Sequence, residues 1–274
     1  MSEKDKNKTE VIHSRIWEEE AEPDNPFAAA ACYCHGYDVY GDLLGKASWT
    51  EYLYLLFMGE RPSPAQARLL EGLAVALANP GPRDHSVRGA MNASVGSATN
   101  TASLLAALAV GSGNLQGSRE IIVAMEYWHA CGHKLTKWQE YLQHPHEEER
   151  IDVWKPIEHP PGFDPHGVSC STPVQQVLQY FSEVSVGNSL PWLLEHRVEL
   201  ETISGCPLAM SGVVAAAFVD IGLNVEQAEM LYLILRLPGA AVHALEQRSY
   251  GMAKYPFFRD GLELLSCTEA SNGE

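Results

Sequence analysis

Arg236 is the side chain whose setting most clearly indicates a binding function. It is the only charged residue between Met230 and His243, and apolar residues flank it on both sides. A guanidinium buried without a partner is very costly, so Arg236 should meet an anion or a set of carbonyl oxygens. A structural Asp or Glu and a ligand carboxylate or phosphate both satisfy this requirement, and the sequence leaves the choice open.

Asp84 and His85 form a second polar pair, located between the helix breaker Pro80-Gly81-Pro82 and the small-residue segment 89–111. A histidine at this place could donate a hydrogen bond to a ligand carboxylate or carbonyl. Alternatively, it caps the start of the following helix. The segment 89–111 is rich in Ala, Gly and Ser, which permit either close helix packing or close approach to a ligand.

Two groups of histidines could suggest a metal site. His129 and His133 would share one face of a helix, but Cys131 between them would point elsewhere, and no second ligand pair stands at structural-zinc spacing. A metal site is therefore a minor alternative. The second group, His144 and His146 before an acidic run, is interpreted as a solvated loop. The sequence has no G-x-G-x-x-G, G-x-x-x-x-G-K-[ST] or G-x-S-x-G motif, so nucleotide-binding and α/β-hydrolase folds have no support.

The composition is that of an ordinary globular protein. The chain has 274 residues, of which 46% are hydrophobic and 20% charged, and this length allows one large domain or two modest ones. Lys and Arg number 19 against 35 Asp and Glu, a formal net charge of −16. This charge argues against broad nucleic-acid binding and against a polybasic membrane anchor.

The sequence also bears on the cellular compartment. Its longest apolar run, around 106–110, is far shorter than the roughly 20 residues of a membrane span. The N-terminus mixes charges of both signs and has no apolar region typical of a secretory signal. The six cysteines form no C-x-x-C pair and are interpreted as reduced thiols. We therefore expect a cytoplasmic protein that binds neither nucleic acid nor membrane.

Helical periodicity dominates the chain. Apolar residues recur at helical spacing from Trp49 to Met58, and Ser63 before Pro64 predicts the N-cap and first residue of a helix that continues to Leu77. Residues 128–141 are predicted to form one helix. No sustained alternating run of β-branched residues is present, so the predicted fold class is all-α or nearly so.

The C-terminal part is predicted to contain two helices. Asn224 with Gln227 forms a capping box that opens the first, Pro238-Gly239 ends it, and the second covers 240–247. Residues 142–172, with five prolines, are predicted to be a long and functional loop. The polar, acidic residues 1–27 are predicted to be a flexible tail or a loosely docked arm.

Four segments, in order, resemble the citrate synthase superfamily, and the short length is closest to its citryl-CoA lyase-like branch. The resemblance covers roughly residues 30–250. The matching segments are Gly36-Tyr37-Asp38 with the following leucine-rich helix, Gly59-Glu60-Arg61-Pro62-Ser63, Asp84-His85, and the stretch from Arg236 through Gly239 and His243 to Glu246. They correspond to the family patterns RGYD, G-x-x-P-[ST], D-H and R-x-x-G-x-x-A-H-x-x-E.

The resemblance implies an all-α fold of a large and a small helical domain, with the active site in the cleft between them. The large domain would comprise 28–115 and 217–274, and the small domain 116–216. It further implies a homodimer that makes or breaks a carbon–carbon bond between an acyl-CoA and a keto acid or a citrate-like carboxylate. Coenzyme A thioester would be the co-substrate, with no bound cofactor. His85 and Arg236 would bind the substrate anion.

The three catalytic positions of the family are substituted. Gln116 takes the place of the histidine in P-L-H-G-G, and Ser211 takes that of the aspartate in N-V-D. In the G-F-G-H segment the histidine is displaced by one residue to His166, and Asp164 is new. An amide can donate a hydrogen bond to an enolate oxygen, but it cannot exchange a proton near pH 7.

These substitutions leave two functions open. The first is an enzyme with diverged chemistry, in which Asp164, His166 or Glu120 supplies a relocated base. The second is a non-catalytic paralogue that binds a carboxylate ligand or serves as a partner or regulatory subunit. An anion site without its base should bind better than it turns over, because general acid–base help is worth roughly 10²–10⁴ in rate.

Overall fold

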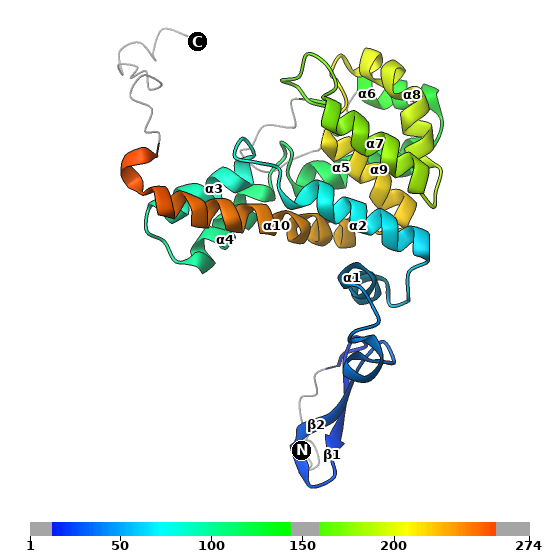
Figure 1. The fold of residues 1–274 in the computed structure, drawn as a ribbon. Helices are drawn as coiled ribbons and strands as arrows, with labels where there is room; N and C mark the ends of the chain where they lie inside the picture. Colours follow the sequence, from blue (N-terminus) through cyan, green and yellow to red (C-terminus); the bar gives the residue numbers. More distant parts are fainter. Residues whose placement is uncertain (1–12, 144–158, 256–274) are drawn as a thin grey trace, which may run out of the picture. The chain divides into compact units, whose positions relative to one another are not determined.

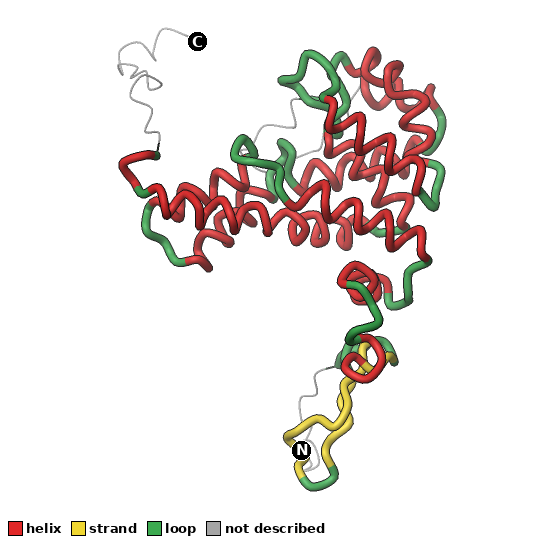
Figure 2. Tube along the Cα trace, viewed as in Figure 1, coloured by secondary structure: helices red, strands yellow, loops and turns green. Residues whose placement is uncertain are grey.

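The structure is a computed structural model that describes residues 13–143 and 159–255. Helices predominate in this part of the chain, as predicted (Figures 1 and 2). They are α1 (Trp49–Met58), α2 (Pro64–Ala78), α3 (His85–Val95), α4 (Asn100–Gly111), α5 (Ser118–Cys131), α6 (Leu135–Gln143), α7 (Thr172–Val184), α8 (Ser189–Ser204), α9 (Met210–Ile221) and α10 (Val225–Tyr250).

A small antiparallel sheet precedes the helices, in the order β1-β2-β3. It consists of β1 (Glu18–Glu22), β2 (Asn25–Cys34) and β3 (Tyr37–Asp38), drawn as strands in Figure 2. The side chains of β1 and of the first part of β2 are exposed. The described part of the predicted tail is thus an exposed hairpin arm. The sequence did not reveal it, because an acidic strand without a buried face lacks hydrophobic alternation.

The chain divides into two compact units. The first comprises residues 1–78 and 112–236, and the second 79–111 and 237–274. In the first unit α5 packs against α9, α9 packs against α8, and α2 packs against α7 and α9, around one core that includes Leu69, Ile121, Phe181 and Phe218. Because α2 shares this core with α5–α9, the unit boundaries fall elsewhere than the predicted domain boundaries. The division into large and small domains stays a prediction.

In the second unit α3 packs against α4 around a core of small residues, including Ala90, Ala107 and Ala240. A Cβ atom on Gly89 would lie 3.3 Å from the backbone oxygen of Ala106. The small side chains of 89–111 therefore serve close helix packing, one of the two uses that the sequence allowed.

The predicted helix starts are confirmed where a cap is encoded locally. The Ser63 hydroxyl accepts from the Gln66 N–H, and Asn224 and Gln227 form the reciprocal pair of a capping box. Two predicted boundaries are wrong. The helix expected over 128–141 is interrupted at Gly132, which has a φ of 52°. The helix expected to end at Pro238 continues through it to Tyr250.

Helix α10 is 26 residues long and mostly apolar. Among the described residues, it alone is long and apolar enough to cross a membrane, a property that the sequence analysis did not anticipate. Length and composition are weak evidence, because core helices pass the same test, and 44% of its apolar window is buried within the protein.

Candidate functional site

Glu120, in the first turn of α5, is fully buried although it carries a carboxyl group. Its Oε1 atom accepts hydrogen bonds from the Ser211 hydroxyl (2.6 Å) and from the Gly162 N–H (2.9 Å), and its Oε2 atom accepts from the Gln116 N–H (2.5 Å). A helix N-terminus also favours negative charge. Donors from three separate segments thus stabilise one buried carboxylate.

The backbone of Gln116 is fixed from both sides. Its φ is 54°, in the left-handed region that is uncommon for a non-glycine residue. While its N–H donates to Glu120, its carbonyl oxygen accepts from Nη1 of Arg236 (2.6 Å) and from the Tyr232 hydroxyl (2.8 Å). Gln116 itself is exposed. The amide side chain therefore belongs to a surface residue on a rigidly held turn.

Arg236 lies on α10 and is only 6% exposed. Its guanidinium carbon lies 4.7 Å from the centre of the Tyr232 ring, and Nη1 also donates to the Tyr232 hydroxyl at 2.9 Å. The expected burial of this cation is confirmed, and a carbonyl oxygen is one of its partners. Arg236, Tyr232, Gln116 and Glu120 form a continuous chain of hydrogen bonds, which we name the Glu120 network together with Ser211 and Gly162.

The close approach of two backbones joins α9 to the loop at Gly162. Gly162 has a φ of 87°, and a Cβ atom on Gly212 would lie 2.4 Å from the Gly162 carbonyl oxygen. The same carbonyl accepts the Ala209 N–H at 2.9 Å. Only glycine fits at these two positions, so the loop can reach Glu120 and place its N–H on the carboxylate.

His159 is an ionisable neighbour of Glu120. Its Nε2 atom lies 3.7 Å from Oε2 of Glu120, and the side chain is 7% exposed. Among the described residues, this nitrogen makes no hydrogen bond. A histidine at this distance contributes electrostatically to the carboxylate only when it is protonated.

The predicted catalytic residues separate into two groups. Gln116 and Ser211 meet at Glu120, where the 2% exposed Ser211 donates its proton to the carboxylate. Asp164 instead accepts from the His166 N–H at 2.9 Å, and His166 is exposed. In the described part of the chain neither of these two residues bonds to Glu120. The catalytic roles of all four stay predictions.

The predicted anion pair is divided between the compact units, since His85 belongs to the second and Arg236 to the first. Asp84 is the N-cap of α3, and its carboxylate accepts from the N–H groups of Ser86 (2.9 Å) and Val87 (3.2 Å). The capping role considered for His85 thus falls to Asp84. His85 begins the helix and is exposed. Its substrate role stays a prediction.

The alternative metal site loses its geometric basis. Helix α5 ends at Cys131, so His129 and His133 do not share a helical face, and Cys131 is 2% exposed. Within the described ranges, no three His, Cys, Asp or Glu residues are placed to hold a metal ion. His144, His146 and the acidic run after them lie outside the described residues.

Burial raises the pKa of the Cys131 thiol from 9.0 to about 11, with smaller effects of Lys137, which lowers it, and Glu140, which raises it. We expect iodoacetamide at pH 8 to modify Cys131 slowly in the folded protein and rapidly in urea, because only the thiolate reacts. Mass spectrometry would measure this, with the half-buried Cys206 as internal comparison. The folded thiol keeps its proton where the unfolded one loses it, so this group's contribution to stability should decline from pH 9 to 11. Equal rates in folded and unfolded protein would contradict the assignment.

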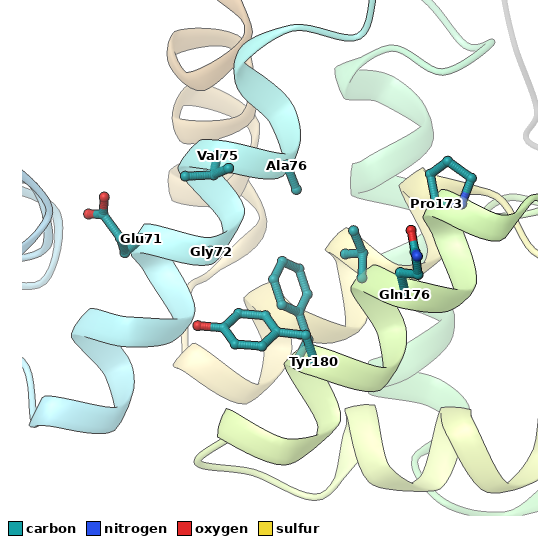
Figure 3. A pocket seen from close by; sticks show the side chains of 9 residues that line it. Glu71, Gly72, Val75, Ala76, Pro173, Gln176 and Tyr180 are labelled. Atoms are coloured by element: carbon teal, nitrogen blue, oxygen red, sulfur yellow. The ribbon is translucent and has the colours of Figure 1, made fainter.

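A separate groove of about 420 Å³ lies between α2 and α7 (Figure 3). Apolar side chains dominate it, including Val75, Val177 and Phe181, and Tyr180 lines it with its ring. None of the predicted site residues contributes to this groove.

Comparison with solved structures shows a citrate synthase-like fold. The citryl-CoA lyase of Hydrogenobacter thermophilus is similar with a TM-score of 0.72 and 18% identity, over 94% of this chain and 95% of that one. The ATP citrate lyase of Methanothrix soehngenii, solved with citrate and coenzyme A, is similar with a TM-score of 0.72 and 16% identity. The match covers 97% of this chain and 44% of that one. Citrate synthase of Thermoplasma acidophilum, solved with carboxymethyl coenzyme A and oxaloacetate, is similar with a TM-score of 0.56 and 13% identity. The match covers 81% of this chain and 60% of that one. No protein-family model and no curated protein matches the chain.

Sequence reasoning missed two members of the site and placed a third without its partners. Tyr232 and His159 gave no signal, since a tyrosine in an apolar helix and a histidine beside prolines are both common. Glu120 was a candidate base, but its burial and its bonds to Ser211 and Gly162 depend on contacts 91 and 42 residues away in sequence.

Proposed function

We propose that this protein binds a citrate-like polycarboxylate or keto acid together with an acyl-CoA, and that it makes or breaks a carbon–carbon bond between them with diverged chemistry. The observation that supports this most is the Glu120 network. It brings together two segments aligned with the family's catalytic residues, Gln116 and Ser211, and connects them to the buried cation Arg236.

The parts of the network suit different tasks. The cation of Arg236 would attract a ligand carboxylate, and in low-dielectric surroundings such an attraction is stronger than in water. The Gln116 amide, on its fixed turn, would donate to a thioester or enolate oxygen. A preorganised donor of this kind is worth about 10²–10³ in kcat. We further propose a cytoplasmic homodimer in which His85 contributes to the anion site.

The non-catalytic paralogue remains the second candidate, and one observation favours it. The Ser211 hydroxyl donates its only proton to Glu120 at 2.6 Å, and both residues are almost completely buried. Such a buried pair stabilises the fold, but it does not offer a substrate an accessible base. A carboxylate-binding or partner subunit would retain Arg236 and need no base.

Coupled assays at high protein concentration decide between the two candidates. Formation of acetyl-CoA and oxaloacetate from citryl-CoA, or CoA release from acetyl-CoA with oxaloacetate, supports the enzyme, and its loss in Gln116→Ala would assign the amide. Calorimetric binding of citrate without any turnover supports the second candidate. Absence of both binding and turnover would refute the proposed function.

A further inference from the structure

Glu120 is the one described residue that bonds directly to the Gln116 turn, the Gly162 loop and the start of α9 at Ser211. Each of its oxygens serves as an acceptor, and Oε1 serves twice. All three partners donate, so the arrangement requires a group that only accepts, and an ionised carboxylate fulfils this. A neutral amide of the same shape would have to direct an N–H group at another donor.

The exposed Gln116 and the buried Arg236 depend on this carboxylate indirectly. Glu120 holds the N–H of Gln116, and the carbonyl of the same peptide turn accepts from Arg236 and Tyr232. The left-handed φ of 54° at Gln116 costs energy, so the turn requires outside bonds to persist. Release of the N–H would let the carbonyl and its bond to Arg236 move.

A second consequence concerns Ser211. Its Oγ atom lies 2.6 Å from Oε1 of Glu120, so an aspartate at this position would place two carboxylates against each other. Like charges this close repel each other, so the pair would take up a proton at a higher pH than a lone carboxylate does. The groups that face this pair of carboxylates would be His159, whose Nε2 atom lies 3.7 Å from Oε2 of Glu120, and the N–H groups of Gly162 and Gln116. The site therefore accommodates one carboxylate, and helix α5 rather than α9 carries it.

We propose that Glu120 is a positioning residue of the ligand site: it acts through Gln116 and Arg236 on the binding of a polycarboxylate, and it excludes a second carboxylate at Ser211. This inference rests on the proposed function, because the ligand class comes from there. It extends that function by assigning the buried carboxylate a role that does not require contact with the ligand.

Calorimetry with citrate, on the full chain, tests the proposal. Glu120→Gln should weaken citrate binding by roughly tenfold or more. Glu229→Gln is the matched control, because Glu229 also accepts a hydrogen bond from a serine, Ser118, at 3.1 Å in the same unit. This control should bind as the wild type does.

Two variants of nearly equal size supply a readout that a merely structural role would not move. Ser211→Asp should bind citrate more weakly than Ser211→Asn at pH 7.5. At pH 5.5 the difference in affinity between the two variants should shrink, because the pair of carboxylates takes up a proton. The double variant Glu120→Gln/Ser211→Asp has only one carboxylate, so its citrate affinity should exceed that of Ser211→Asp already at pH 7.5. If Glu120→Gln fails to fold, the comparison of Ser211→Asp with Ser211→Asn still tests the positioning role.

The outcomes are distinguishable. Wild-type affinity in Glu120→Gln, or equal behaviour of Ser211→Asp and Ser211→Asn at both pH values, would overturn the positioning role while leaving the proposed function in place. If the wild type binds neither citrate nor CoA, the proposed function fails and the positioning role fails with it.

Discussion

Replacing Glu120 by alanine should lower the free energy of unfolding by about 3–5 kcal/mol, because the Ser211 hydroxyl and the N–H groups of Gly162 and Gln116 would lose their acceptor at once. A buried donor without a partner costs about 1–3 kcal/mol. Urea unfolding followed by circular dichroism would measure the change.

The matched control is Glu229→Ala, which removes an acceptor from one longer hydrogen bond. This variant should lower the free energy of unfolding by only about 1 kcal/mol. Comparable losses in the two variants would mean that Glu120 stabilises the protein no more than an ordinary partly buried glutamate does, and the Glu120 network would lose its basis.

Gly212→Ala should be similarly damaging, by about 3 kcal/mol or more. The new Cβ atom would lie 2.4 Å from the Gly162 carbonyl oxygen and 2.8 Å from Cδ1 of Leu208. The leucine side chain can shift, but the carbonyl oxygen can give way only if the backbone of the loop moves. The shift would also withdraw the Gly162 N–H from Glu120. Thermal and urea unfolding would measure the loss.

Gly96→Ala serves as the comparison for this variant. Gly96 ends α3 with a φ of −69°, and its Cβ atom would stay 3.4 Å from the nearest oxygen. Alanine should be nearly neutral there. If Gly212→Ala were also neutral, the loop at Gly162 would not be held against α9 as described.

Features encoded by a few neighbouring residues could be predicted from the sequence. The caps at Ser63 and Asn224 depend on a side chain and a backbone group three residues away, and both predictions are confirmed. The burial of Arg236 followed from its apolar neighbours and is also confirmed. Four motif segments in the right order predicted the fold that the structural comparison shows.

Features that depend on tertiary packing could not be predicted. Pro238 should have ended its helix, but Leu235 on one side and Ala240 on the other are each buried in the core of their own unit, and this packing offsets the roughly 3 kcal/mol cost of an interior proline. Likewise, nothing local marks Glu120 as buried. Its partners come from distant segments, and only the folded chain brings them together.

Citrate binding by Arg236→Ala is the measurement that tests the central claim most directly. Calorimetry should show binding to the wild type and a loss of about tenfold or more in the variant. Arg61→Ala is the control, since Arg61 also lies over a tyrosine ring, that of Tyr37, but is exposed. Binding that is unchanged by Arg236→Ala, or reduced equally by Arg61→Ala, would contradict an anion site at the buried guanidinium.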